Sequence, residues 1–162
     1  FTYPERILRT KSAPVEVVDD DIRRLVDDMA ETMYAAPGIG LAANQVGVAK
    51  RVVVVDVTHP DGAPNLYVLI NPVIVARAGE IVWEEGCLSF PGFHVDVDRA
   101  AHVVVRALDR NGKPIEIEAD ELLAIAMQHE IDHLDGLTLA DKVSFLKRKM
   151  MVRELTKARE AS

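Results

Sequence analysis

The chain has 162 residues, of which 49% are hydrophobic and 28% charged, and its formal net charge is −7 at pH 7. This composition is typical of a globular domain with a sizeable core, so we expect residues 1–162 to form a single domain. The negative charge argues against a sequence-specific nucleic-acid binder or a protein held on an anionic membrane. No apolar run approaches the roughly 18 residues of a membrane span, and no signal peptide is visible. The lone cysteine, Cys87, excludes an intramolecular disulfide and fits a reducing compartment.

The first third of the chain predicts an extended arm, a helix and a loop of small residues. Residues 1–18 carry two prolines and read as the arm. Acidic residues at 19–21 then begin an amphipathic helix, which Pro37-Gly38 ends. Residues 38–47 are mostly small, which indicates a close approach to the backbone. Gln45 is the one long polar side chain there, either a functional group or a solvated loop residue, and the spacing does not match a phosphate-binding loop.

The middle of the chain predicts strands. Residues 51–57 form a β-branched run, and 67–70 and 73–76 read as two segments interrupted by Asn71-Pro72. We expect a turn at 59–62, and strands at 102–108 and 115–118 joined by a hairpin at Asn111-Gly112. The glycines and proline of residues 84–92 predict that no regular element forms there.

Cys87 follows two glutamates within that irregular stretch. Neighbouring carboxylates disfavour the thiolate of a free cysteine, whereas a bound divalent cation favours it. Cys87 therefore makes better sense as a metal ligand than as a nucleophile.

A helix predicted over residues 120–135 carries the pattern H-E-x-x-H. Asp120 is the expected N-cap, and Gly136 stands where a glycine ends a helix. His129 and His133 are one turn apart on one face, so both imidazoles can point at one metal ion. Glu130 lies about 100° further round, well placed to reach a water molecule at that ion. By itself this pattern also occurs by chance, and it lacks a third ligand.

A basic final helix is predicted from about Ser144 to residue 160.

Three stretches taken together resemble the peptide deformylase family. They are Gly38-Ile39-Gly40-Leu41-Ala42-Ala43-Asn44-Gln45, which fits GxGLAAxQ; Glu85-Gly86-Cys87-Leu88-Ser89; and Gln128 to Gly136 around H-E-x-x-H. The resemblance implies an α+β fold in which antiparallel β-sheets surround a central helix bearing both histidines. It implies a hydrolase that removes the formyl group from the N-terminal formyl-methionine of new polypeptides, within one catalytic domain over residues 1–162.

The resemblance also assigns the site residues. Cys87, His129 and His133 become the metal ligands, Glu130 the general acid and base, and Gln45 with the backbone N–H of Leu88 the oxyanion donors. We expect the methionine side chain and substrate backbone to meet six residues: Ile39, Gly40, Gly86, Leu122, Ile125 and Ala126. Either His94 or Arg99 is a candidate for a basic residue at the mouth of the cleft.

The metal and the partners remain open at this point. A Cys-His₂ ligand set suggests zinc, whereas the resemblance implies ferrous iron as the native ion, with zinc, nickel or cobalt able to replace it. A zincin-type metallopeptidase is the main alternative function. We expect a monomer in a bacterial cytoplasm or an organelle matrix, and contact with the ribosome through the basic final helix.

Overall fold

The computed structural model describes residues 11–36, 38–58, 65–87 and 90–137, and for residues 83–96 its description covers the backbone alone. The elements in chain order are α1 (Asp20–Ala35), β1 (Gly40–Ala42), the 3₁₀ helix η2 (Ala43–Val46), β2 (Val52–Val55), β3 (Tyr67–Ala78), β4 (Ile81–Cys87), β5 (Phe90–Arg99), β6 (His102–Leu108), β7 (Pro114–Asp120) and α2 (Glu121–Leu134). The turn expected at 59–62 and the final basic helix lie outside the described residues.

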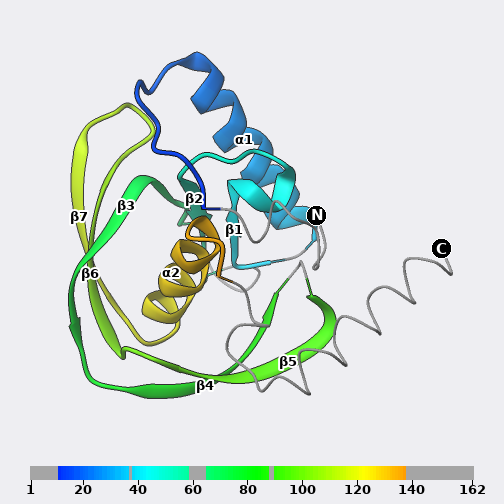
Figure 1. Ribbon diagram of the computed structural model, residues 1–162, viewed down its shortest axis with the longest axis vertical. Coiled ribbons are helices and arrows are strands. Elements are labelled where there is room, and N and C mark those ends of the chain that lie inside the picture. The colour runs from blue at the N-terminus through cyan, green and yellow to red at the C-terminus, as the bar shows by residue number, and fades with distance from the viewer. Residues whose placement is uncertain (1–10, 37, 59–64, 88–89, 138–162) are drawn as a thin grey trace, which may run out of the picture.

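Helix α2 lies inside the curve of an antiparallel sheet (Figure 1). This sheet has five strands in the order β1-β2-β3-β6-β7, and β4 and β5 form a separate antiparallel pair. Helix α1 packs against β1 and β2. The predicted α+β architecture, with antiparallel sheets around a central histidine-bearing helix, is therefore confirmed.

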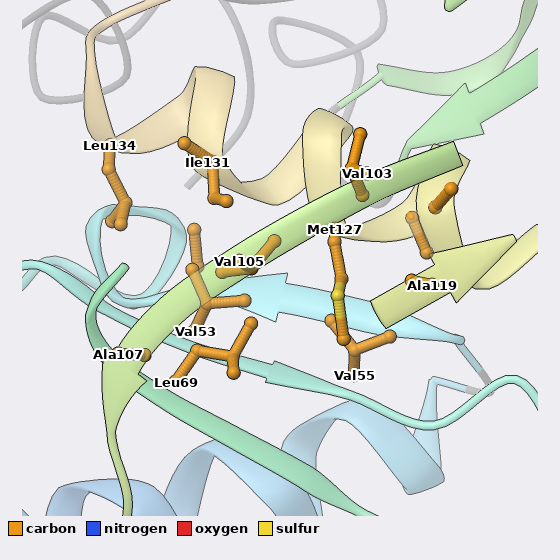
Figure 2. Close-up of a cluster of buried hydrophobic side chains, with 13 residues drawn as sticks. Val53, Val55, Leu69, Val103, Val105, Ala107, Ala119, Met127, Ile131 and Leu134 are labelled. Atoms are coloured by element: carbon orange, nitrogen blue, oxygen red, sulfur yellow. The ribbon is translucent and has the colours of Figure 1, made fainter. Parts of the chain in front are cut away.

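Strand β2 is apolar throughout because it is covered on both faces. Val53 and Val55 belong to the core cluster beneath α2, whereas Val52 and Val54 pack with residues of α1. All four valines have 0% exposure. Figure 2 shows the α2 side of this arrangement, where three side chains of the helix face those of the strands: Met127, Ile131 and Leu134. The buried strand thus fixes how both helices sit on the sheet.

Local sequence signals at α1 and at the β6–β7 hairpin are confirmed. The Asp19 carboxylate caps α1 by accepting the Ile22 N–H at 3.0 Å. In the hairpin, Asp109 N–H donates to the Lys113 carbonyl at 2.8 Å. Gly112 adopts a φ of 81°, a conformation that favours glycine.

Two predictions about the strands were wrong. Residues 84–87 and 90–92 belong to regular strands, since β4 and β5 pair there with Gly86 opposite His94 and a shift of register before Cys87. Within the described part of the chain each of these strands has one hydrogen-bonded neighbour, and such edge strands tolerate glycine and proline. Asn71-Pro72 does not divide β3 into two strands either. A β-bulge absorbs the pair, with Asn71 at a φ of 53°.

Candidate active site

The two histidines of α2 bring their ring nitrogens together. The Nε2 atoms of His129 and His133 are 3.2 Å apart, and the side chains are almost fully buried. Two nitrogen ligands about 2.1 Å from a tetrahedral ion would lie about 3.4 Å apart. Together with a Glu130 oxygen, these nitrogens form a cluster whose atoms all lie within 4.8 Å of one another. The donor set therefore fits a divalent metal ion.

The protonation state of His133 suits the same role. Burial, and then the neighbouring His129 ring and the Arg99 guanidinium, lower the pKa of His133 well below its usual value. The imidazole is therefore neutral at pH 7, which is the form that binds metals.

The Glu130 side chain packs directly against Gly40. Its side chain is 5% exposed. A Cβ atom added to Gly40 would lie 2.5 Å from Glu130 Oε2 and 2.9 Å from Glu130 Cγ. Strand β1 can approach the carboxylate this closely only because residue 40 has no side chain, which explains one of the small residues noted in the sequence.

Gln45 is buried rather than solvated. It lies in η2 with 4% exposure, and its Oε1 accepts the Ala42 N–H at 2.9 Å. This bond orients the Gln45 amide, because its carbonyl oxygen faces the Ala42 N–H and its NH₂ group is therefore on the opposite side.

The segment before β1 is bonded to the backbone of a buried aspartate. Asp56 has 0% exposure, and its backbone N–H donates to the Ile39 carbonyl at 2.8 Å. The Asp56 carboxylate accepts hydrogen bonds from Tyr34, from the N–H and hydroxyl of Thr58, and from the Asn65 N–H. Although burial raises the pKa of Asp56, these hydrogen bonds outweigh it and lower the pKa to about 2. Ile39 itself is 38% exposed.

The last turn of α2 is tied to three distant parts of the chain. Asn44 Nδ2 donates to the His133 carbonyl at 2.5 Å. The Leu134 carbonyl accepts the Ser12 N–H at 2.7 Å and Arg51 Nη1 at 3.2 Å. Arg51 also pairs with the Asp135 carboxylate at 2.9 Å. The final carbonyls of a helix lack partners within it, and here other segments supply them.

The first turn of α2 has no such ties from side chains. Asp120 occupies the N-cap position, as predicted, but its side chain makes no capping hydrogen bond. The carboxylate instead bonds His102 Nδ1 at 2.6 Å. Glu121 has a φ of 52°, which costs free energy for a residue with a side chain, and its N–H donates to the Ala101 carbonyl at 3.0 Å.

The remaining predicted site residues are placed unevenly. Ile125 and Ala126 are buried in α2, with Ala126 part of the core cluster, and Leu122 is half-buried. Gly86 and Cys87 end β4, and the Cys87 side chain and the whole of Leu88 lie outside what the structure describes. His94 is placed by its backbone only. Arg99 is 7% exposed and is paired with Asp132 of α2.

Sequence reasoning missed the contacts that steady α2. The Gln128 amide is paired with Ala100, accepting its N–H at 3.0 Å and donating to its carbonyl at 2.8 Å. The pairing of Arg99 with Asp132 and that of Asn44 with His133 were also missed. The one signal available was that Asn44 and Gln128 each follow a run of apolar or small residues.

Known proteins match this chain over nearly its full length. The family model for polypeptide deformylase matches residues 1–149. The peptide deformylase of Alkalilimnicola ehrlichii is 58% identical over 157 residues, covering 97% of this chain and 88% of that protein. The one from Thermodesulfovibrio yellowstonii is 55% identical over 148 residues, covering 91% and 90%. A crystal structure of a peptide deformylase from Legionella pneumophila superposes with a TM-score of 0.92 at 45% identity, covering 99% of this chain and 94% of that one.

These comparisons favour a deformylase over a zincin-type peptidase, and the buried His-Glu-His cluster agrees with the metal dependence of that family. Neither described helix has the length and apolar character needed to cross a bilayer. The chain belongs to the polypeptide deformylase family, the metallohydrolases that remove the formyl group from the N-terminus of new polypeptides.

Proposed function

We propose that Cys87, His129 and His133 hold the catalytic metal of this deformylase and that ferrous iron is its native ion. The paired Nε2 atoms and the neutral state of His133 support the two histidine assignments. Three protein ligands leave a fourth position open, as catalytic sites do. When bound, such a cation supplies an acidified water molecule and a Lewis acid for the formyl carbonyl. Zinc, nickel or cobalt can fill the same ligand set.

In the proposed mechanism Glu130 moves the protons. It takes a proton from the attacking water and later delivers it to the leaving amine, which releases formate and a free N-terminus. Its burial against Gly40 supports this role, because a carboxylate held in one place is aligned before the substrate arrives. The Gln45 amide and the Leu88 N–H stabilise the oxyanion, and the orientation of Gln45 by Ala42 supports the first of these assignments.

In this proposal the apolar socket for the methionine side chain is formed by four residues: Ile39, Leu122, Ile125 and Ala126. Gly40 and Gly86 lie where the backbone of the substrate approaches. The exposure of Ile39 beside buried Gly40 supports a position at the rim. Enlarging Ala126 to Phe would then raise KM for formyl-Met peptides, and an unchanged KM in a folded variant would remove Ala126 from the socket.

One sample tests the metal and the activity together. The protein is purified without oxygen, its metals are quantified, and formate release is measured on formyl-Met-Ala-Ser and on Met-Ala-Ser as the matched control. We expect iron in active samples and formate from the blocked peptide only. Cleavage of Met-Ala-Ser would indicate a peptidase, and full activity in iron-free zinc protein before any exposure to oxygen would overturn iron as the required ion.

We further propose that residues 1–162 act as one monomeric catalytic domain, in a bacterial cytoplasm or an organelle matrix, close to the ribosome. Support for ribosome contact comes from the charge of residues 144–160, where lysine and arginine outnumber glutamate. These residues lie outside the described part of the chain. Sedimentation with 70S ribosomes tests the contact, with Lys147→Glu/Arg148→Glu/Lys149→Glu as the variant expected to lose it.

A further inference from the structure

We propose that Asn44 is a positioning residue that ties the segment carrying Gln45 to the helix end carrying His133. The proposal rests on the function proposed above, in which Gln45 stabilises the oxyanion and His133 binds the metal. The family pattern GxGLAAxQ specifies Gln45 but leaves the position of Asn44 open.

The contact of Asn44 is short and fully buried. Its side chain has 0% exposure, and Nδ2 donates to the His133 carbonyl at 2.5 Å across 89 positions of the chain. A buried amide is costly without a hydrogen bond. Among the residues that the structure describes, Asn44 Oδ1 has no hydrogen-bond partner. The bond to His133 is thus the contact that accounts for a polar side chain at this position.

The geometry of η2 links this contact to Gln45. A 3₁₀ helix has three residues per turn, so the side chains of Asn44 and Gln45 leave it about 120° apart. The segment is closed on itself, because Gly47 N–H donates to the Asn44 carbonyl at 3.2 Å and Val48 N–H to the Ala43 carbonyl at 3.1 Å. A closed turn moves as one piece. A rotation that took Asn44 from His133 would therefore also displace the Gln45 amide.

The same contact restrains the metal-binding side chain. The His133 carbonyl also accepts the Gly136 N–H at 3.0 Å, so both of its lone pairs are used at the end of α2. Groups that orient a metal ligand from behind change metal affinity or activity by about 10–100-fold when they are removed. We expect Asn44 to act at the lower end of that range, because it holds the backbone of His133 rather than its ring.

Asn44→Leu tests the proposal, since leucine fills a similar volume and cannot donate a hydrogen bond. Arg51→Met is the matched control, because Arg51 bonds the next carbonyl, that of Leu134, from outside η2. Asn44→Thr keeps a hydroxyl donor and serves as the conservative variant. The measurements are kcat and KM on formyl-Met-Ala-Ser, the rate of zinc loss to a chelator, and the Tm of the metal-free protein.

We expect Asn44→Leu to lower kcat and to speed zinc loss, each by about 10-fold, with KM within about twofold of wild type. Arg51→Met should lower the Tm but change kcat and zinc loss by less than about twofold, and Asn44→Thr should recover part of both losses. Equal effects of Asn44→Leu and Arg51→Met on all three measurements would overturn the proposal. The proposal would also be overturned if Asn44→Thr folds but loses as much kcat, and releases zinc as fast, as a soluble Asn44→Leu variant.

Zinc loss separates this proposal from the proposed function. If wild type releases no formate, the assigned activity fails, yet the chelator experiment still decides whether Asn44 steadies His133. If Asn44→Leu does not fold, Asn44→Thr and Asn44→Ala are compared instead. Slower zinc loss in the threonine variant then supports the proposal, and equal rates overturn it.

Discussion

The two ends of helix α2 are held in different ways. The last turn, which carries His133, is bonded to residue 12, to η2 and to the residue preceding β2. The first turn follows β7 without a loop, lacks a side-chain cap and begins with a residue at positive φ. Stabilising contacts are therefore concentrated at the end of α2 that carries His133. The first turn connects β7 to α2, and backbone strain is tolerated there.

The largest effect is expected at Glu130, near the well-held end. Glu130→Gln keeps the shape of the side chain but cannot accept a proton, so kcat should fall by about 10²–10⁴-fold. Metal content should stay at the wild-type level, because neither histidine is altered. Steady-state kinetics with metal analysis of the same samples makes the test, and a fall of less than tenfold would mean that another group moves the proton.

Gly40→Ala should have the next largest effect. The added methyl would lie 2.5 Å from Glu130 Oε2, so the carboxylate or β1 must shift. A displacement of about 1 Å can cost about 10²-fold in rate. Gly79→Ala is the control, because an added Cβ there would meet Ala101 Cβ at 3.1 Å rather than Glu130, although its φ of 68° will cost some stability. A Gly40→Ala enzyme with normal kcat would show that Glu130 adapts without cost.

Acid should weaken the support behind β1. The folded pKa of Asp56 is about 2 against an ordinary value of 3.8. This carboxylate therefore stabilises the fold above about pH 4, by about 2 kcal/mol, and that contribution is lost as the pH falls from about 4 towards 2. Denaturant unfolding at pH 7 and pH 3 should reveal it, with Asp56→Asn much less sensitive over that interval. Parallel pH curves for the two proteins would contradict the assignment.

Arg51→Met should weaken the well-held end by about 1–2 kcal/mol, because it removes hydrogen bonds to Leu134 and to Asp135. The free energy of unfolding of the metal-free protein measures this loss. Asp120→Ala at the other end is the comparison. It should cost less than about 0.5 kcal/mol, because no capping bond exists to lose and the bond to His102 that it removes is solvent-exposed. A larger cost at Asp120 would reverse the contrast between the two ends.

The smallest expected effect is a gain in stability. Glu121→Gly relieves a φ of 52° at the poorly held end, which favours the folded state by about 1 kcal/mol before the entropy of glycine is subtracted. A small rise in Tm is therefore expected, with kcat unchanged. A marked loss of stability would indicate that the acidic side chain contributes more at the helix N-terminus than the strain costs.

Local patterns predicted what local physics decides. The spacing of His129 and His133, the acidic start of α1 and the Asn111-Gly112 turn depend on neighbours within a few residues, and each prediction is confirmed. The fit of Gly40 to Glu130 and of Asn44 to His133 depends on packing between segments about 90 positions apart. Single-sequence patterns contain no term for such pairings.

The hairpin of β4 and β5 was missed for a related reason. Glycine and proline disfavour an interior strand, yet among the described residues these two strands pair only with each other. Whether a strand lies at an edge is a property of the finished sheet. Propensity therefore predicted a loop where topology permits a strand.

That hairpin leaves the main sheet and returns to the same place. Ala78 at the end of β3 and His102 at the start of β6 are register partners. The residues between them, Cys87 included, therefore form an excursion whose two ends are already adjacent in the main sheet. Changing the length of such an excursion adds little to the entropic cost of bringing β3 and β6 together. We therefore expect that the hairpin carrying Cys87 can be exchanged between homologous enzymes while the main sheet and α2 fold as before.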